Sequence, residues 1–474
     1  MDTKRRQRAK YIASDLLSAA LAWTALFSFR KLALEEAGWD GLSSVVADSN
    51  YWLGLVVVPL GWLALYVIMG SYRDVLRRSR VKELVETLVA TLIGSVVLFF
   101  VLIIDDEVPR LVDYYRSFLF LLAVHFTLTY LPRLAITSQT VRRVHSRLLG
   151  FPAIMIGGGN RAMQTYLDLE NQETYSGEQF VGYVDIDTTG RPSPLAKVMP
   201  RLGTMDDLPA LVTRLGVEEV ILAVEESQRH MIWQLLPAVN RCGELIIKLT
   251  PDARDIIVGS VRQESIFHSP LITLDTRLMP EWQYSVKRIA DVVLSALALV
   301  VLSPVFLITA AIVKLSSPGP VFYAQERVGY RGRPFKMHKF RSMYVDAEKA
   351  GPALSKDDDP RITPFGRFMR KVRLDEIPQF YNVLRGTMSI VGPRPERQFY
   401  IDQIVQRAPE YLLLQRIKPG ITSWGQVKYG YASNVDEMVE RLRYDLLYLD
   451  NMSLMTDIKI LCYTVLIILQ GRGK

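Results

Sequence analysis

The sequence predicts a membrane protein in three parts: a bundle of four transmembrane helices (residues 1–146), a cytoplasmic α/β domain (147–277) and a mostly α-helical domain (278–474). The first third of the chain holds four apolar stretches, the middle third alternates apolar strands with helices, and a fifth apolar run opens the last third. Hydrophobic residues make up 49% and charged residues 22% of the chain, a balance that fits neither a purely soluble nor a wholly embedded protein.

The four apolar stretches approach the length needed to cross a bilayer, which is roughly 20 residues. The last is the shortest, contains His125 and ends at Pro132. No small-residue cleavage site follows the first stretch, so a cleaved signal peptide is not indicated. The expected spans are Tyr11–Phe29, Tyr51–Met69, Thr87–Ile104 and Ser117–Pro132.

Charge in the connecting segments predicts the orientation of the bundle. Basic residues crowd the first ten residues, the segment 71–82 and the segment 133–147, whereas the segments 35–48 and 105–113 are acidic. Basic segments stay in the cytoplasm. Four crossings satisfy this rule and place everything after Arg133 on the cytoplasmic side of the membrane.

The fifth apolar run, Ile289–Val313, has basic residues at both ends. Both flanks therefore favour the cytoplasm. Ser303 and Pro304 lie in its middle, and proline kinks a helix because it lacks a backbone donor. We expect a re-entrant helix over 287–314 that bends at Ser303-Pro304, in preference to a kinked fifth span.

Residues 151–275 read as an α/β domain with a parallel sheet, since strands alternate with helices. The first strand, Ala153–Ile156, runs into a glycine-rich turn. Gly157 and Gly159 with Ala162 imitate the dinucleotide fingerprint G-x-G-x-x-A, in which phosphate approaches a helix N-terminus. The match is short. We favour a Rossmann-like domain that uses the glycines for a tight turn and leave nucleotide binding open.

Residue counts exclude several site classes and suggest an anionic ligand. The two cysteines, Cys242 and Cys462, and five scattered histidines give neither a disulfide framework nor a zinc motif. A metal should therefore have oxygen ligands, as Mg²⁺ does. Between Lys314 and Arg373 there are 14 Lys/Arg and 6 Asp/Glu, an excess that matches the net charge of +8 of the whole chain. Lipid head groups, phosphates or nucleic acid suit such a window.

The segment 370–386 predicts a short helix that begins at two carboxylates. Asp375 is a natural N-cap, Pro378 suits the first turn and Gly386 suits the position after the end. Asp375 and Glu376 would then lie at the positive end of the helix dipole, where carboxylates stay ionised. Such groups suit a nucleophile or a magnesium ligand. A plain N-cap beside a surface acid is the alternative.

Arg394 lies in Gly392-Pro393-Arg394-Pro395, where two prolines stiffen the backbone. A fixed guanidinium suits a bidentate contact with phosphate. A rigid turn with a structural salt bridge would look the same.

Together these motifs resemble the monotopic polyprenyl-phosphate phosphoglycosyl transferase superfamily, the bacterial sugar transferases. They occur in the family's order across residues 287–422, and the added bundle and α/β domain resemble its long members. The segments that carry the resemblance are Lys287-Arg288, Ser303-Pro304, Gln325–Gly329, Lys339–Met343, Asp359–Thr363, Leu374–Gln379, Gly392–Pro395 and Lys418–Thr422.

The resemblance implies a two-step transfer of a sugar 1-phosphate from a UDP-sugar to undecaprenyl phosphate. Asp375 would be the nucleophile, Asp375 and Glu376 would hold Mg²⁺, and Arg370, Arg394 and Arg341 would bind phosphates. Anionic substrates and membrane lipids, and not nucleic acid, would then account for the basic window. Long members also suggest a homodimer.

Two departures bear on the sugar. Arg373 stands where many members have a small hydroxyl residue, and Ser423-Trp424 stand where many have glycine and another residue. The motifs do not specify which sugar is used.

Two other functions fit parts of the sequence. A membrane-anchored NAD-dependent nucleotide-sugar dehydratase would need a Tyr-x-x-x-Lys pair, which the sequence lacks. A non-enzymatic regulator of polysaccharide assembly would not need Asp375, Glu376 and Arg394 intact.

Overall fold

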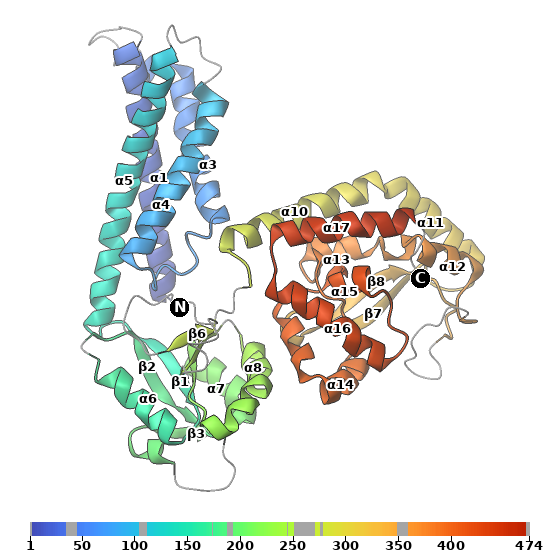
Figure 1. Cartoon of the computed structure of the whole chain (residues 1–474). Helices are drawn as coiled ribbons and strands as arrows, with labels where there is room; N and C mark the ends of the chain where they lie inside the picture. Colours follow the sequence, from blue (N-terminus) through green and yellow to red (C-terminus); the bar gives the residue numbers. More distant parts are fainter. Residues whose placement is uncertain are drawn as a thin grey trace. The chain divides into compact units, whose positions relative to one another are not determined.

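The computed structural model describes residues 2–34, 45–103, 111–172, 174–186, 193–243, 245–250, 271–274, 278–347 and 359–470. They form two compact units, Met1–Gly150 with Thr174–Gly177, and the remainder of the chain. Figure 1 shows the helical bundle, the α/β domain and the C-terminal domain. The predicted boundary at 277/278 stays a prediction.

The first unit is a bundle of four helices, each long and apolar enough to cross a membrane, which confirms the predicted number. Tryptophans fill its core at glycines of neighbouring helices. A Cβ on Gly54 would lie 2.1 Å from Trp23, and one on Gly94 would lie 2.2 Å from Trp62, so only glycine allows these approaches. The helices are α1 (Asp2–Phe29), α3 (Ser49–Ile68), α4 (Arg80–Leu98) and α5 (Leu111–His145).

The helix that contains the fourth predicted span, Ser117–Pro132, is longer than that span. Helix α5 continues through Pro132 to His145. Arg133, which the sequence suggested as a cytoplasmic flank, is fully buried inside the bundle. Buried acids neutralise Arg133 at this position. The remaining basic residues of the segment 133–147 come at the end of the helix, and the acidic residues of segments 35–44 and 104–110 lie outside the described residues.

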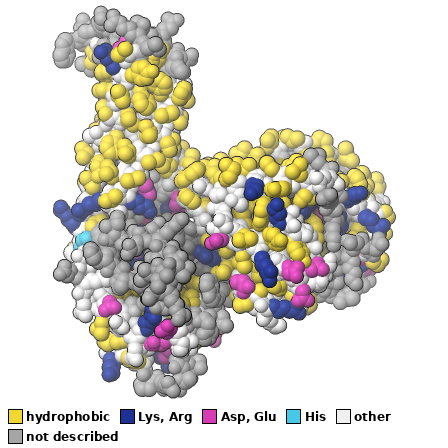
Figure 2. Space-filling view, viewed as in Figure 1, with side chains coloured by type: hydrophobic (Ala, Val, Ile, Leu, Met, Phe, Trp, Pro, Cys, Tyr) yellow, Lys and Arg dark blue, Asp and Glu magenta, His cyan; other side chains and the backbone are white. Residues whose placement is uncertain are grey.

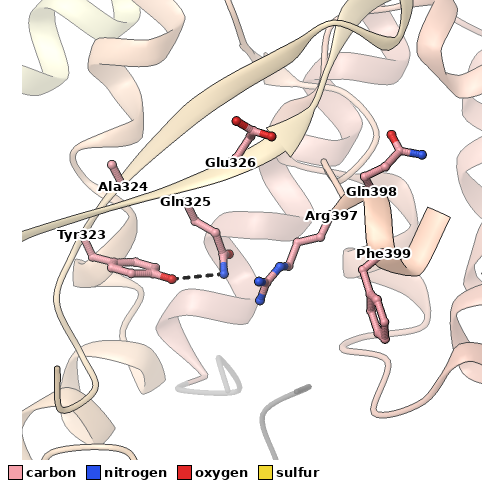
Figure 3. A pocket seen from close by; sticks show the side chains of 7 residues that line it. All are labelled: Tyr323, Ala324, Gln325, Glu326, Arg397, Gln398 and Phe399. Carbon is pink, nitrogen blue, oxygen red and sulfur yellow. Dashed lines mark hydrogen bonds between the residues drawn. The ribbon is translucent and has the colours of Figure 1, made fainter. Parts of the chain in front are cut away.

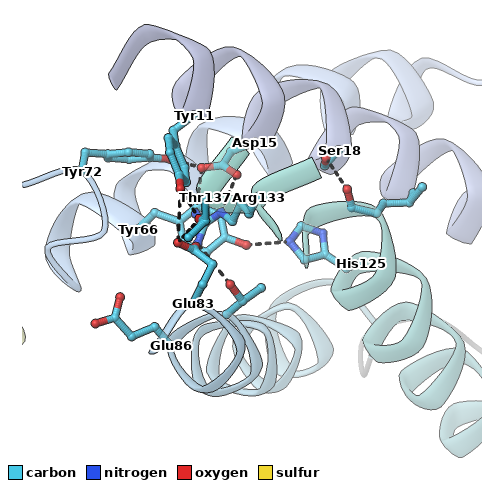
Figure 4. A network of polar contacts seen from close by, with 12 residues as sticks. Tyr11, Asp15, Ser18, Tyr66, Tyr72, Glu83, Glu86, His125, Arg133 and Thr137 are labelled. Carbon is cyan, nitrogen blue, oxygen red and sulfur yellow. Dashed lines mark hydrogen bonds and ion pairs between the residues drawn. The ribbon is translucent and has the colours of Figure 1, made fainter. Parts of the chain in front are cut away.

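Arg133 is the centre of a buried polar network (Figure 4). Its Nε and Nη2 atoms donate to the two carboxylate oxygens of Asp15, each at 2.7 Å, and its Nη1 lies 3.4 Å from Glu83 Oε1. Tyr72 donates its hydroxyl to Asp15 at 2.7 Å, and Arg78 lies 3.2 Å from Glu83. Three helices and the segment between α3 and α4 are thus joined through paired charges.

The α/β domain contains a six-stranded sheet in the order β3-β2-β1-β4-β5-β6. The first five strands are parallel, as predicted, and β6 pairs antiparallel with β5. This is the strand order of a Rossmann fold. The strands are β1 (Phe151–Ile156), β2 (Glu178–Val184), β3 (Arg201–Gly203), β4 (Glu219–Leu222), β5 (Ile246–Leu249) and β6 (Ile272–Leu274); the helices are α6 (Asn160–Glu170), α7 (Leu208–Leu215) and α8 (Ile232–Arg241).

The C-terminal domain is mostly helical, as predicted, with two small sheets. Strands β7 (Phe322–Val328) and β8 (Pro334–Phe340) form an antiparallel hairpin, and β9 (Ser389–Val391) pairs parallel with β10 (Gly420–Thr422). The helices are α10 (Glu281–Val301), α11 (Ser303–Ser316), α12 (Pro364–Lys371), α13 (Gln379–Arg385), α14 (Gln398–Arg407), α15 (Trp424–Lys428), α16 (Val435–Asp450) and α17 (Leu454–Leu469).

The fifth apolar run is a bent helix pair. Helix α10 ends at Val301, α11 begins at Ser303, and the two axes differ by 63°. Pro304 lies in the first turn of α11, where its missing N–H costs no helical hydrogen bond. Figure 2 shows hydrophobic side chains along this pair. The bend at Ser303-Pro304 is confirmed, and the exposed apolar side chains include Val293, Leu297, Val300, Leu307 and Ile308.

The re-entrant path predicts where single cysteines react. The two native cysteines are first removed by Cys242→Ser/Cys462→Ser. Single cysteines are then introduced by Tyr284→Cys and Leu315→Cys, near the two ends of the bent pair. We expect both to react with a membrane-impermeant maleimide only in inside-out vesicles. Val300→Cys, although 71% exposed in the protein, should react on neither side because lipid covers it.

A kinked fifth span would give the opposite pattern, with Tyr284→Cys and Leu315→Cys labelled from opposite sides. Pro304→Ala should straighten the pair and move part of the Leu315→Cys reaction to the outer side.

Candidate active site

Two adjacent carboxylates lie in a short 3₁₀ turn, Leu374–Glu376. Asp375 and Glu376 are 7% and 6% exposed. The expectation that Asp375 caps a helix is wrong, because α13 begins four residues later and no side-chain cap bond forms at the turn. Pro378 immediately precedes α13 instead of lying in its first turn, and Gly386 follows its end in the left-handed conformation, as expected. The carboxylates are therefore held by side chains rather than by a helix terminus.

Lys339 of strand β8 contacts both carboxylates. Its Nζ donates to Glu376 Oε1 at 3.1 Å and lies 3.9 Å from Asp375 Oδ2. Arg373 lies 3.6 Å from the other Glu376 oxygen. The backbone of Arg373 is left-handed, with φ of 59°, a conformation that costs a non-glycine residue on the order of 1–3 kcal/mol. Surrounding contacts hold this residue against its backbone preference.

The Glu396 carboxylate holds Arg394 in place. The Glu396 carboxylate is 3% exposed and lies 2.6 Å from Arg441, 3.3 Å from Arg327 and 4.0 Å from Arg394. Three arginines thus share one buried carboxylate. The rigid turn and the salt bridge that the sequence suggested as an alternative are both present, and they orient the Arg394 side chain. Because three arginines share the single Glu396 carboxylate, the group as a whole keeps a positive charge.

Tyr431 joins two of the arginines. Its ring centroid lies 5.0 Å from the Arg394 guanidinium carbon and 5.6 Å from that of Arg373. Cation–π contacts of this kind orient guanidinium groups without consuming their N–H donors. Arg373, one of the two departures from the family pattern, is therefore part of the site.

Arg370 and Arg341 occupy different surroundings. Arg370 Nε donates to Ser342 Oγ at 3.0 Å, and its positive charge is attracted by the Asp375 carboxylate. Arg341 instead donates to the carbonyls of Pro318, Ser317 and Val313, at 2.8, 2.6 and 3.2 Å. These contacts close the end of α11. The geometry therefore does not favour the phosphate-binding role expected for Arg341.

The bent membrane pair is tied to the site through α10. Asp291 accepts hydrogen bonds from Ser389 Oγ at 2.7 Å and from the Ile390 N–H at 3.0 Å. Lys287 pairs with Asp457 of α17 at 2.6 Å, and Arg288 donates to two carbonyls at the end of α13. The basic flank that the sequence suggested for topology is thus a set of specific contacts. It holds the start of the membrane pair against the domain that carries Asp375.

Burial and neighbouring charges shift the pKa values of the two carboxyl groups in opposite directions. Burial and the neighbouring Glu376 charge raise the pKa of Asp375. Despite burial, the pKa of Glu376 is lowered to about 2 by Lys339, Arg373 and Arg394. Glu376 therefore keeps its charge at all ordinary pH values, and Asp375 is the member of the pair that takes up a proton first.

The donor set suits a hard cation shared with phosphate. The part of the chain that the structure describes holds no group of three or more His, Cys, Asp and Glu side chains that could bind a metal ion by themselves. Mg²⁺ commonly takes one or two carboxylates and completes its shell with water and substrate phosphates. Asp375 and Glu376 can supply that pair, and Glu376 Oε2 is buried without a hydrogen-bond partner. The residues therefore fit Mg²⁺ bound together with an anionic substrate.

The glycine-rich loop of the α/β domain faces a carboxylate. Gly157 has φ of 115°, and Gly159 precedes the first residue of α6. The Arg161 N–H at this helix start donates to Glu225 Oε1 at 3.0 Å, and a Cβ on Gly159 would lie 2.2 Å from the same oxygen. A side-chain anion thus occupies the position at which a dinucleotide phosphate would bind. The geometry favours the tight-turn interpretation.

Sequence reasoning missed Lys339, Tyr431 and Glu396 as members of the site. Lys339 was recognised only within a family motif, and Glu396 was visible as the residue after Arg394-Pro395. Tyr431 gave no signal, because it lies 37 residues beyond Arg394 in a loop after α15.

Comparison with known families gives two matches. Residues 282–471 match the model described as bacterial sugar transferase, and residues 67–242 match the model described as CoA-binding domain. The first match contains the carboxylate pair, Arg394 and the bent helix pair.

Individual relatives support the first match. The chain is 42% identical over 220 residues to a UDP-N-acetylgalactosamine-undecaprenyl-phosphate N-acetylgalactosaminephosphotransferase of Aeromonas hydrophila, covering 46% of this chain and 51% of the relative. It is 34% identical over 297 residues to a UDP-glucose:undecaprenyl-phosphate glucose-1-phosphate transferase of Escherichia coli, covering 62% and 63%. An uncharacterized sugar transferase of Bacillus subtilis is 37% identical over 187 residues, 40% of this chain and 89% of that protein. The chain thus spans about half to just under two thirds of the two longer relatives.

Proposed function

This chain belongs to the bacterial sugar transferase family, and we propose that it transfers a sugar 1-phosphate from a UDP-sugar to undecaprenyl phosphate, releasing UMP. The observation that carries the proposal is the buried Asp375–Glu376 pair, surrounded by Lys339, Arg370, Arg373 and Arg394. Four cations around two carboxylates leave an excess of positive charge, which suits a diphosphate substrate.

In the first step, an Asp375 carboxylate oxygen attacks the phosphorus that carries the sugar. The bond from this phosphorus to the bridging oxygen breaks, UMP leaves with the electron pair, and the sugar phosphate remains on Asp375. Lys339 lies close enough to orient the Asp375 carboxylate, while Arg394 and Arg370 stabilise negative charge on the phosphoryl oxygens.

In the second step, a phosphate oxygen of undecaprenyl phosphate attacks the same phosphorus. Asp375 leaves as a free carboxylate, and the product is the diphosphate-linked sugar. The bent pair α10–α11 is anchored to the same domain through Asp291, so a lipid phosphate at the membrane surface can reach the site. Splitting the transfer into two displacements replaces one difficult step by two easier ones.

Mg²⁺, if bound at Asp375 and Glu376, would neutralise charge on the diphosphate and on the leaving UMP. Glu376 supports this role because it keeps its charge while Asp375 acts as nucleophile. Lys339 and Arg373 hold the Glu376 carboxylate in place.

We further propose that the catalytic domain faces the cytoplasm, where UDP-sugars are made, and that the protein works as a homodimer in the inner membrane. The four candidate spans support a membrane protein. A first membrane step of exopolysaccharide, capsule or O-antigen synthesis would follow from the product. Mass measurement of the detergent-solubilised enzyme tests the dimer, and a strict monomer would contradict it.

The function is tested directly with purified protein in detergent. UDP-glucose, UDP-galactose and their N-acetylated counterparts are each supplied with undecaprenyl phosphate and Mg²⁺, and UMP release and labelled lipid are measured. We expect equal amounts of UMP and lipid-linked sugar with at least one donor. A dehydratase would instead change the sugar without releasing UMP, and a regulator would do neither.

The raised pKa of Asp375 predicts the acid limb of the pH profile. The nucleophile must be ionised, so turnover should fall as the pH decreases through a pKa above the ordinary range for aspartate. Lys339→Gln removes the largest opposing charge, so its acid limb should lie at higher pH than that of the wild type. The measurement is kcat/KM for UMP release against pH.

Lys336→Gln is the matched control, because Lys336 is an exposed lysine on the same strand. Its profile should match the wild type. An acid limb that stays in place in Lys339→Gln would show that another group controls the profile.

A further inference from the structure

A polar groove of about 370 Å³ lies between strand β7 and the segment that leads into α14 (Figure 3). Tyr323 and Gln325 reach it from the strand, and Arg397 reaches it from the other side; in Figure 3 these three side chains point toward one another. Glu326 and Phe399 also border it, but the Glu326 side chain points away from these three in Figure 3, because neighbouring strand residues alternate between faces.

The groove borders the proposed active site on two sides. Tyr323 pairs directly with Lys339 across the hairpin, and side chains at paired positions lie on the same face of a sheet. Lys339 is the residue that contacts both catalytic carboxylates. Arg397 follows Arg394 by three residues. A group bonded to a phosphate held at Asp375 and Arg394 can therefore extend into the groove.

The Gln325 amide is oriented before any ligand binds. Its oxygen accepts from Arg327 Nη2 at 2.6 Å, and its nitrogen donates to the Tyr323 hydroxyl at 3.2 Å. Arg327 is itself held by Glu396, the carboxylate that positions Arg394. The groove and the phosphate-binding arginine thus share one support.

The chemistry of the lining suits a neutral ligand rich in hydroxyl groups. An amide, a phenol and a guanidinium supply donors and acceptors, and Arg397 is the one charged group among the three side chains that meet there. The cations that suit phosphate, Lys339, Arg370, Arg373 and Arg394, lie at the carboxylate pair, whereas the groove offers one guanidinium among uncharged polar groups. In a nucleotide sugar, the sugar ring is bonded to the phosphate that is transferred.

We propose that this groove is the sugar subsite and that Tyr323, Gln325 and Arg397 set which UDP-sugar is used. The proposal rests on the proposed transferase function and extends it to the choice of sugar. Oriented hydrogen-bonding groups discriminate strongly between sugars that differ in one hydroxyl, because a mismatched sugar leaves them unpaired.

The test compares kcat/KM for UDP-glucose, UDP-galactose, UDP-N-acetylglucosamine and UDP-N-acetylgalactosamine in the full-length enzyme. We expect the ratio between the preferred donor and its C4 epimer to fall about tenfold or more in Gln325→Ala, and less in Tyr323→Phe, which removes only a hydroxyl. Inhibition by UMP, which lacks the sugar, should be unchanged in both. Gln406→Ala, an exposed glutamine on α14 outside the groove, is the matched control.

Unchanged donor ratios in both variants would overturn the sugar subsite while leaving the transferase function intact. Weaker inhibition by UMP in the variants would assign the groove to the nucleoside and also overturn it. A wild type that uses all four donors equally would show that the groove does not select the sugar. If the wild type releases no UMP with any donor, the proposed function itself fails.

Discussion

Asp375→Asn should abolish turnover, lowering the rate of UMP release by roughly 10⁴-fold or more, as expected when a nucleophile is removed. Asparagine keeps the size of the side chain but cannot displace UMP. Asp375 is buried, and its nearest basic neighbour, Lys339, retains its hydrogen bond to Glu376, so the fold should persist. UMP release with saturating UDP-sugar measures the effect.

The covalent step has its own readout. Wild-type enzyme given UDP-sugar without lipid should accumulate a phosphosugar, and mass spectrometry should place it on the peptide that contains Asp375. Asp450→Asn, an exposed aspartate at the end of α16, should form the adduct normally. Near-normal turnover of Asp375→Asn, or an adduct on another residue, would refute the mechanism without refuting the family.

Arg133→Met should destabilise the helix bundle by about 3–5 kcal/mol, the cost of leaving a buried ion pair without one partner. Arg133 is 0% exposed and satisfies both oxygens of Asp15 as well as one of Glu83. Without it, two buried carboxylates lose their shared cation inside the bundle. The loss is measured as the free energy of unfolding, by titrating the purified protein in detergent with denaturant.

Two further variants isolate the cause. Arg142→Met, on the exposed end of the same helix, should change stability by less than about 0.5 kcal/mol. Replacing the closest pair together, as in Asp15→Leu/Arg133→Met, should recover much of the lost stability, because Glu83 keeps Arg78 as its partner and neither buried carboxylate is left unpaired. Equal stability of Arg133→Met and wild type would mean that water reaches the network.

Local patterns predicted most of the architecture. Four spans follow from the length of the apolar stretches, and the bend at Ser303-Pro304 follows from one proline between basic flanks. The parallel sheet follows from strands that alternate with helices. The burial of Arg133, which the sequence suggested as a basic flank, was not predicted, because its partners, Asp15 and Glu83, lie 118 and 50 residues away.

The site was partly visible in the sequence. Asp375, Glu376, Arg370 and Arg394 were identified from motif and charge. The N-cap assigned to Asp375 failed because Arg373 adopts a left-handed conformation and a 3₁₀ turn precedes α13. Arg341 was grouped with the phosphate ligands, but its donors close the end of α11.

The sequence alone determined the membrane bundle, the α/β domain, the family and the chemical identity of the carboxylate pair, because each depends on residues close together in the chain. The tertiary structure decided which cations surround that pair and which stay structural. Lys339, Arg394 and Tyr431 come from a hairpin, a proline-rich turn and a distant loop, and no local periodicity reports that they meet. The tertiary structure also determines that Glu225 faces the glycine-rich loop, because the strand order brings the end of β4 beside the start of α6.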